Sequence, residues 1–164
     1  MDPAELLQSP LYSRACKNAL RVMERLAAAS TQRPGSVRHL DALAAETGAS
    51  GPALEQAINL LRLAGLVEKP KTAEGGVRLA RAASRISMLE VVQAIDGAGL
   101  WARCILGLAE CLDEAPCPAH EVWKKTRALL EQQLKSRSMA DLAEAVGTRR
   151  KSRRSGSIRA RRRR

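Results

Sequence analysis

The sequence predicts a mainly α-helical fold: a winged helix-turn-helix with a small two-stranded wing, followed by a long C-terminal dimerisation helix. The first reason is composition. The 164-residue chain has 2% aromatic residues and no Phe, so its core must consist of Leu, Val, Ile, Ala and Met, which suits packed helices. The second reason is the order of the elements: helix, helix, Gly-containing turn, helix and two-stranded ribbon, which is the order of a winged helix-turn-helix.

The first part of the chain carries clear helix boundaries. Asp2-Pro3-Ala4-Glu5 and Ser9-Pro10 are two possible helix starts, and apolar residues then recur at helical spacing to about Ala29. A short helix around Leu40 to Ala44 stops at Thr47-Gly48. Ser50 is a good N-cap for the next helix, about Gly51 to Ala64, which Gly65 closes.

Two short strands follow, at residues 66–69 and 77–80, with a turn-rich segment at 70–76 between them. Ser87 and Glu90 form a capping box that opens a helix ending at Gly97. A long helix with alternating charges begins at Pro118, and a last short helix runs from Ser138 to Val146.

The charge of +11 is concentrated at the C-terminus. Residues 149–164 hold ten of the 28 Lys and Arg residues and no acid, so the rest has 18 basic and 17 acidic residues. We therefore divide the chain into a winged unit (1–97), a cysteine loop (98–117), a dimerisation and terminal helix region (118–147) and a basic tail (148–164). We expect the tail to be disordered and to act as a non-specific DNA-binding arm.

Three of the four cysteines and one of the two histidines lie within seventeen residues, at Cys104, Cys111, Cys117 and His120. Packing does not require such a cluster, whereas a thiolate-ligated metal or an iron–sulfur cluster does. Three Cys and one His suit tetrahedral zinc as well as iron on ligand count alone. Cys16, on the first helix, is expected to be a small core residue.

These pieces together resemble the IscR/NsrR-type family of bacterial winged-helix transcription regulators over about Ser13 to Val146. The resemblance is carried by the segments at 16–21, 54–67, 75–81 and 86–97, by the three cysteines, and by Cys117-Pro118-Ala-His120 with Trp123. It implies that Cys104, Cys111 and Cys117 hold an iron–sulfur cluster, 2Fe–2S or 4Fe–4S, with zinc the less favoured alternative. The fourth ligand would be His120 or a carboxylate such as Asp2 or Glu5.

The resemblance also implies double-stranded DNA as the partner, and a homodimer formed through the helix from Pro118. Polar side chains of the 51–64 helix and its N-cap can read bases, and nearby cations can contact phosphates. The base-reading candidates are Ser50, Glu55, Gln56 and Asn59, and the phosphate candidates are Arg62, Lys69, Lys71, Arg78 and Arg81. The predicted function is a cluster-controlled transcription regulator, in the first place a repressor. The alternative is a cluster-free or zinc-stabilised winged module that works through protein contacts.

Other classes of protein find no support. No run of about 18 apolar residues and no secretory signal is present, so a cytoplasmic protein without a membrane span is expected. The sequence has no Gly-rich phosphate loop or paired catalytic carboxylates, so no enzyme is predicted.

Overall fold

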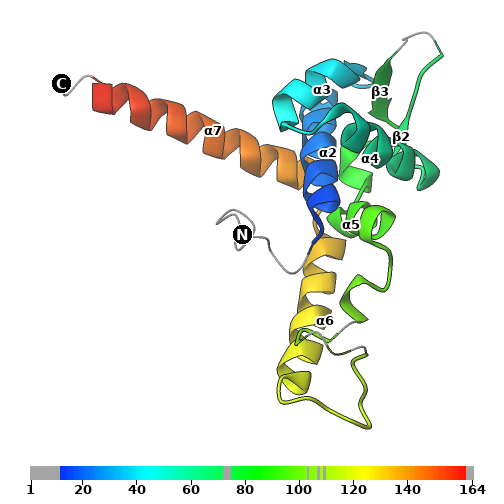
Figure 1. Cartoon of the computed structure of the whole chain (residues 1–164). Coiled ribbons are helices and arrows are strands. Elements are labelled where there is room, and N and C mark those ends of the chain that lie inside the picture. The colour runs from blue at the N-terminus through cyan, green and yellow to red at the C-terminus, as the bar shows by residue number, and fades with distance from the viewer. Residues whose placement is uncertain (1–11, 72–74, 103, 107, 109, 162–164) are drawn as a thin grey trace.

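The computed structural model describes residues 12–71, 75–102, 104–106, 108 and 110–161. It is mainly helical, with a small antiparallel sheet (Figure 1). The helices are α2 (Arg14–Gln32), α3 (Leu40–Thr47), α4 (Gly51–Leu63), α5 (Met88–Asp96), α6 (His120–Ser136) and α7 (Met139–Arg161), with 3₁₀ turns at Ala83–Arg85 and Leu100–Ala102. The strands are β1 (Arg38–His39), β2 (Val67–Glu68) and β3 (Gly76–Leu79). The predicted winged helix-turn-helix is confirmed.

The helix-turn-helix consists of α3 and α4, joined at Gly48. Gly48 has φ 72° and donates its backbone N–H to Ala44 O, which ends α3 with a left-handed residue that glycine adopts without strain. Gly65, with φ 68°, follows α4 in the same way. One stripe of α4, formed by Leu54, Ala57, Ile58 and Leu61, is buried, so its other faces are free to contact a partner.

The wing has one strand more than predicted. β2 and β3 pair in antiparallel register, with Val67 opposite Leu79 and Glu68 opposite Arg78. β1 adds to the other side of β3, giving the order β1-β3-β2. Neither Arg38 nor His39 of β1 is of a residue type enriched in strands, so only the pairing with β3 identifies this strand.

The core joins the winged unit to the C-terminal helices. Met23 and Leu26 of α2, Ile58 of α4 and Met139 of α7 lie in one buried cluster. A second cluster packs Cys16 and Val92 with Trp101, Trp123 and Leu134, and so connects α2, α5 and α6. Cys16 is a fully buried core residue, as expected, and burial, with Asp96 nearby, raises the pKa of its thiol to about 12.

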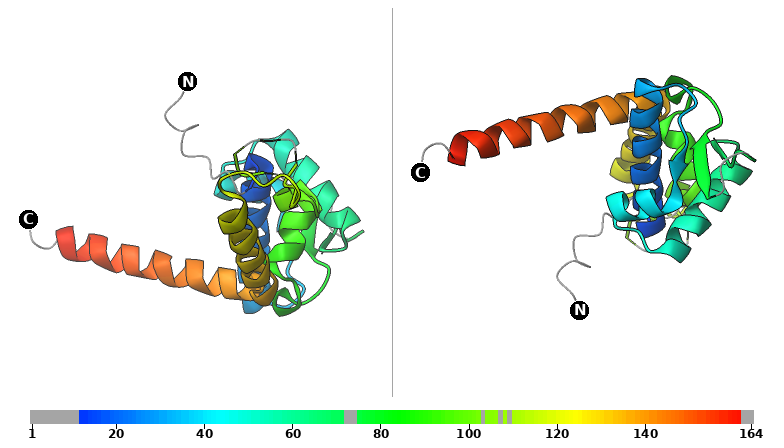
Figure 2. Two further views of the ribbon diagram at one scale, coloured as in Figure 1. Left: turned by 90° about the horizontal axis from the view of Figure 1, so that it is seen from below. Right: turned by 90° about the horizontal axis from the view of Figure 1, so that it is seen from above.

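The C-terminal helices differ from the predicted bounds. α6 begins at His120, two residues after Pro118, and α7 does not end near Gly147 but continues to Arg161. The segment 148–161, expected to be disordered, is therefore helical. Arg, Lys and Ala are good helix formers and no proline interrupts the run, which is compatible with a continued helix. α7 leaves the body as a long projecting rod (Figure 2). Among the described residues, no helix has the length and apolarity that a membrane span requires.

Candidate cysteine cluster and DNA-contacting surface

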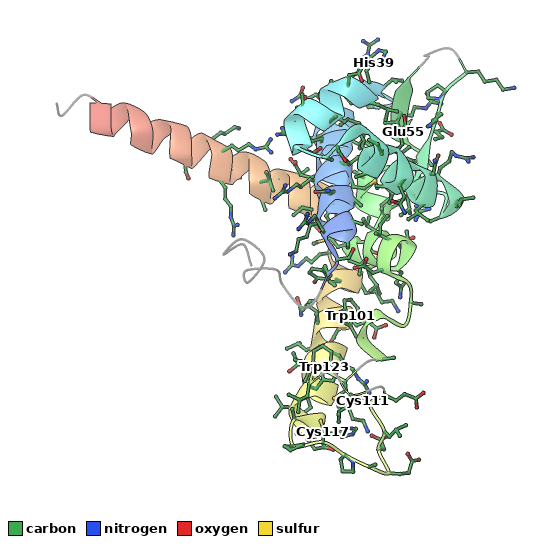
Figure 3. All side chains as sticks on the ribbon, in the orientation of Figure 1. His39, Glu55, Trp101, Cys111, Cys117 and Trp123 are labelled. Atoms are coloured by element: carbon green, nitrogen blue, oxygen red, sulfur yellow. The ribbon has the colours of Figure 1, made fainter. Side chains whose placement is uncertain are left out.

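The cysteine loop lies between α5 and the start of α6, at the end of the molecule far from the wing (Figure 1). Cys104 follows the 3₁₀ turn Leu100–Ala102, and His120 is the first residue of α6. Cys111 and Cys117 lie beside the start of α6, with Trp101 and Trp123 nearby (Figure 3). The fold thus brings all four predicted ligands into one region, against the second hydrophobic cluster.

Cys104 and Cys117 form the first pair, with their Sγ atoms 3.6 Å apart. Cys104 is 7% exposed. The pKa of its thiol is lowered chiefly by the backbone N–H of Leu106, against the effect of burial, with further hydrogen bonds from Cys117 and the backbone of Leu108. These hydrogen bonds favour the thiolate, which is the form that binds metal and reacts with oxidants.

Cys111 and His120 form the second pair, with Sγ and Nδ1 3.4 Å apart. His120 is 3% exposed, and its Nε2 lies 2.8 Å from Asp113 Oδ1. Lys124 Nζ donates to the same oxygen at 2.8 Å, and these two hydrogen bonds hold the pKa of Asp113 below its usual value. A carboxylate that accepts from Nε2–H leaves the lone pair of Nδ1 facing Cys111, which is the tautomer that ligates a metal.

The contacts of Asp113 could not be predicted from the sequence. An acid in the loop would be expected only to disfavour neighbouring thiolates. Here it is turned toward His120 and Lys124 instead, and it fixes the imidazole. The seven-residue separation from His120 crosses a loop, so no helical or strand periodicity could have indicated the contact.

The donor atoms fit a thiolate-ligated group that has two binding centres. Two ligands of one tetrahedral metal, at about 2.3 Å for sulfur and about 2.0 Å for nitrogen, lie about 3.8 Å apart for two sulfurs and about 3.5 Å apart for sulfur and nitrogen. Both observed pairs are close to these separations. Within the described part of the chain, no three His, Cys, Asp or Glu side chains converge to hold a single ion. The described side chains therefore form two ligand pairs and not one site of three or more ligands. The alternative ligands Asp2 and Glu5 lie outside the described residues.

The predicted base-reading residues lie on the solvent side of the helix-turn-helix. Ser50, Glu55, Gln56 and Asn59 are all exposed, as is the phosphate candidate Arg62, and Glu55 is labelled on α4 in Figure 3. Asn59 and Arg62 also line a groove between α4 and strand β2, together with Lys69. α4 and the wing therefore form one continuous surface that offers both hydrogen-bonding groups and cations.

Two of the predicted phosphate contacts already have partners within the domain. Arg78 Nε donates to Glu68 Oε1 at 2.6 Å across the wing. Arg81 pairs with Glu90, and it also donates to Gly65 O at 3.4 Å. Arg81 thereby connects the end of α4 to the start of α5 and stabilises the winged unit. A DNA phosphate that contacts Arg81 would share its guanidinium group with Glu90.

The chain is similar to known transcriptional regulators. Residues 12–145 match the family Rrf2, described as iron-dependent transcriptional regulators. An HTH-type transcriptional regulator of Mycobacterium tuberculosis (strain ATCC 25618 / H37Rv) is 34% identical over 132 residues, covering 80% of each chain. A regulator described in the same words from Neisseria meningitidis serogroup B (strain MC58) is 30% identical over 78% of this chain and 85% of its own.

Two solved structures share the fold. IscR of T. potens superposes with a TM-score of 0.63 at 27% identity, covering 87% of this chain and 90% of its own. The oxidized form of Staphylococcus aureus CymR gives 0.64 at 25%, covering 80% and 94%. The chain belongs to the Rrf2 family, and it is a DNA-binding transcriptional regulator and not an enzyme.

Proposed function

We propose that this regulator binds its operator as a homodimer, in the first place as a repressor, under the control of an iron–sulfur cluster held by Cys104, Cys111, Cys117 and His120. The observation that carries the proposal is the arrangement of these side chains as two ligand pairs, with His120 Nδ1 turned toward sulfur by Asp113. When bound, such a cluster supplies chemistry that responds to oxidants, nitric oxide or iron supply.

The loop has a physical connection to the DNA-reading helix. Trp101, three residues before Cys104, packs in the cluster that contains Val92 of α5, and its backbone oxygen accepts from Arg127 of α6 at 3.3 Å. α5 in turn contacts α4. A change in how the four ligands are held would therefore change the position of α6 relative to the winged unit. The cluster would shift the equilibrium between the two positions only by the difference in its affinity for them.

DNA reading is assigned to the exposed side of α4. Helices of this kind enter the major groove, where Gln56 and Asn59 can pair with adenine and Glu55 can accept from cytosine. Ser50, at the N-terminus of α4, can contact a base or a phosphate. Arg62 and the wing cations Arg78 and Arg81 would contact phosphates.

The homodimer is assigned to α6. Val122 and Leu129 are 71% and 59% exposed, and they lie on one side of the helix at a seven-residue spacing. Ile105, Leu106 and Leu108 of the neighbouring loop are also exposed apolar residues. An apolar surface of this kind marks an interface, and a two-fold operator requires a two-fold protein.

The dimer assignment is tested by the double variant V122E/L129E, measured by sedimentation or light scattering. It is expected to be monomeric with unchanged circular dichroism. The matched control is Leu63→Glu, which alters a side chain 77% exposed on α4 and should remain dimeric. A dimeric double variant would exclude α6 as the interface.

The cluster assignment is tested by Cys104→Ala in anaerobically purified protein. This variant should lose iron, acid-labile sulfide and specific DNA binding, and should keep its helical content. Glu114→Ala, which alters an exposed acid of the same loop, should keep all four properties. Stoichiometric zinc in a colourless wild-type protein would refute iron and favour the zinc-stabilised alternative.

A second candidate is a cluster-free thiol switch, which the 3.6 Å separation of the Cys104 and Cys117 sulfurs and the lowered pKa of Cys104 favour. With hydrogen peroxide as oxidant, the two thiols would form one disulfide and two molecules of water. Among the structural neighbours, CymR was solved in an oxidized form. Peroxide treatment of the metal-free protein would then remove two hydrogens in mass in the wild type and in Cys111→Ser, and none in Cys117→Ser.

A further inference from the structure

The last part of α7 is a strongly basic helix that lies outside the winged unit. We call residues 149–161 the basic extension. It contains seven Lys and Arg residues and no acid, at positions 149, 150, 151, 153, 154, 159 and 161. Its backbone is helical through Arg161, so it spans about 20 Å at 1.5 Å per residue. It projects from the body on the side away from the wing (Figures 1 and 2).

We propose that the basic extension is a second DNA-binding element, which grips phosphates of double-stranded DNA outside the stretch read by α4 and the wing. It would add affinity and salt dependence but no sequence preference, because phosphate contacts carry no base information. The proposal rests on DNA binding by this family and is independent of the cluster.

The charge distribution favours an extended polyanion as the partner. At 100° per residue, the basic positions of the extension fall on all sides of the helix, and Ile158 is its one large apolar residue. A helix that docks into a protein groove needs an apolar stripe, which this segment lacks. Double-stranded DNA carries one charge per about 1.7 Å of its axis, so it can neutralise several of these cations at once.

Several residues of the extension have a low helix propensity, and bound DNA would add to the stability of this helix. Gly156 costs about 1 kcal/mol relative to alanine inside a helix, and Ser152, Ser155 and Ser157 are also poorer helix formers. Like charges at close spacing repel one another along the helix. Phosphates that neutralise the cations remove this repulsion, so binding and helix formation support each other.

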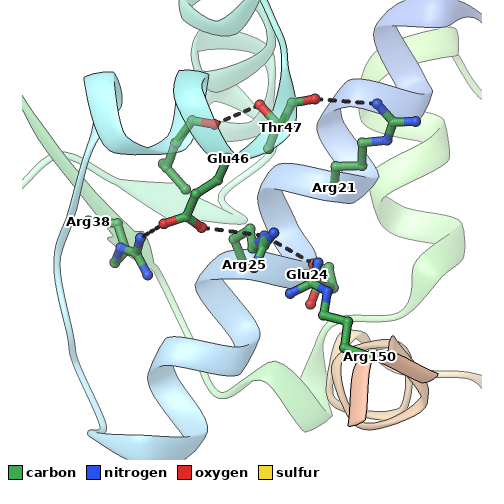
Figure 4. Close-up of polar contacts among 8 residues, drawn as sticks. Arg21, Glu24, Arg25, Arg38, Glu46, Thr47 and Arg150 are labelled. Atoms are coloured by element: carbon green, nitrogen blue, oxygen red, sulfur yellow. Dashed lines mark hydrogen bonds and ion pairs between the residues drawn. The ribbon is translucent and has the colours of Figure 1, made fainter. Parts of the chain in front are cut away.

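Contacts with the rest of the protein fix the direction in which the extension begins. Arg150 Nη2 donates to Oε2 of Glu24, a carboxylate on α2 that is 5% exposed. Glu24 belongs to a chain of alternating charges (Figure 4): Arg25 lies 3.6 Å from Glu24 and 3.4 Å from Glu46, and Glu46 also pairs with Arg38 of β1. Met139 and Ala143, buried at the start of α7, complete the anchor. These contacts therefore connect the start of the extension to α2, α3 and β1.

The test uses the full-length protein and a random-sequence duplex of about 40 base pairs, with affinity measured by anisotropy between about 50 and 200 mM salt. Replacing Arg153, Arg154, Arg159 and Arg161 with glutamine should flatten the slope of log affinity against log salt by about 3 to 4, at about 0.9 for each phosphate that the protein no longer neutralises. Arg150 and its hydrogen bond with Glu24 are left intact. Circular dichroism should also show a gain in helix when the duplex is added to the wild type, and no such gain in the variant.

Two double variants, each of which removes two positive charges, test whether the effect on DNA binding depends on where the charges lie. R153Q/R154Q should flatten the slope by about 2. R14Q/K135Q removes the same charge from exposed positions on α2 and α6 and should leave the slope unchanged. Equal slopes for wild type and R153Q/R154Q, or equal reductions in both doubles, would overturn the proposal. So would an extension that binds anionic vesicles while the salt slope for DNA stays unchanged.

Discussion

Replacing Asp113 with alanine removes the carboxylate that accepts from His120 Nε2 at 2.8 Å, and should weaken the hold on the cluster. The imidazole then loses the partner that keeps its Nδ1 lone pair toward Cys111. Outer partners of this kind are worth about 10 to 100-fold in metal affinity. The Asp113 side chain is 65% exposed, so water can replace part of its hydrogen bond, and we expect an effect near tenfold.

The assay follows the visible absorbance of the anaerobic protein as a chelator is added. The chelator concentration at which half of the absorbance is lost should fall about tenfold in Asp113→Ala. Asp113→Asn, whose amide oxygen can still accept from Nε2–H, should lie between this variant and the wild type. The control is Glu114→Ala, the exposed neighbouring acid, which should behave as the wild type. Equal midpoints for all four proteins would refute the role of Asp113 in holding His120 as a ligand.

Further predictions concern the fold. Ser87→Ala removes the capping box with Glu90 and should cost about 1 kcal/mol, seen as a melting temperature about 2 to 4 °C lower; an unchanged melting temperature would contradict this. Met139→Ala, at a fully buried site, should cost about 2 to 5 kcal/mol in urea unfolding, and a smaller loss would mean that α7 is loosely docked. The backbone N–H of Ser138, and then its side chain, lower the pKa of Asp141. Ionised Asp141 therefore stabilises the folded protein at neutral pH, and this stabilisation is lost below about pH 4. Urea midpoints of Asp141→Asn should therefore fall less on acidification than those of the wild type.

Much of the fold could be predicted because its boundaries are local. The N-cap at Ser87, the left-handed glycines 48 and 65, and the apolar stripe of α4 each depend on a few neighbouring residues, and all lie where expected. Strand β1 could not be predicted, because its two residues are a strand only through pairing with β3. The composition of residues 149–164 predicts disorder, so the length of α7 could not be predicted from it.

The candidate site could also be predicted only in part from the sequence. The four ligand candidates lie in one segment of the sequence, so their closeness could be predicted. The pairing of Cys104 with Cys117 and of Cys111 with His120 depends on how the loop folds, so it could not. Likewise, the charge of Arg78 and Arg81 predicted phosphate contacts. Their pairing with Glu68 and Glu90 depends on strand register and on how α5 meets the wing.

The most direct test of the cluster assignment is the iron and acid-labile sulfide content of the wild-type protein purified without oxygen, recorded together with its visible spectrum. Two ligand pairs predict two iron and two sulfide per chain and a coloured protein, with specific DNA binding that changes when the iron is removed. A colourless protein without iron, whose specific DNA binding is unaffected by chelators, would contradict the account.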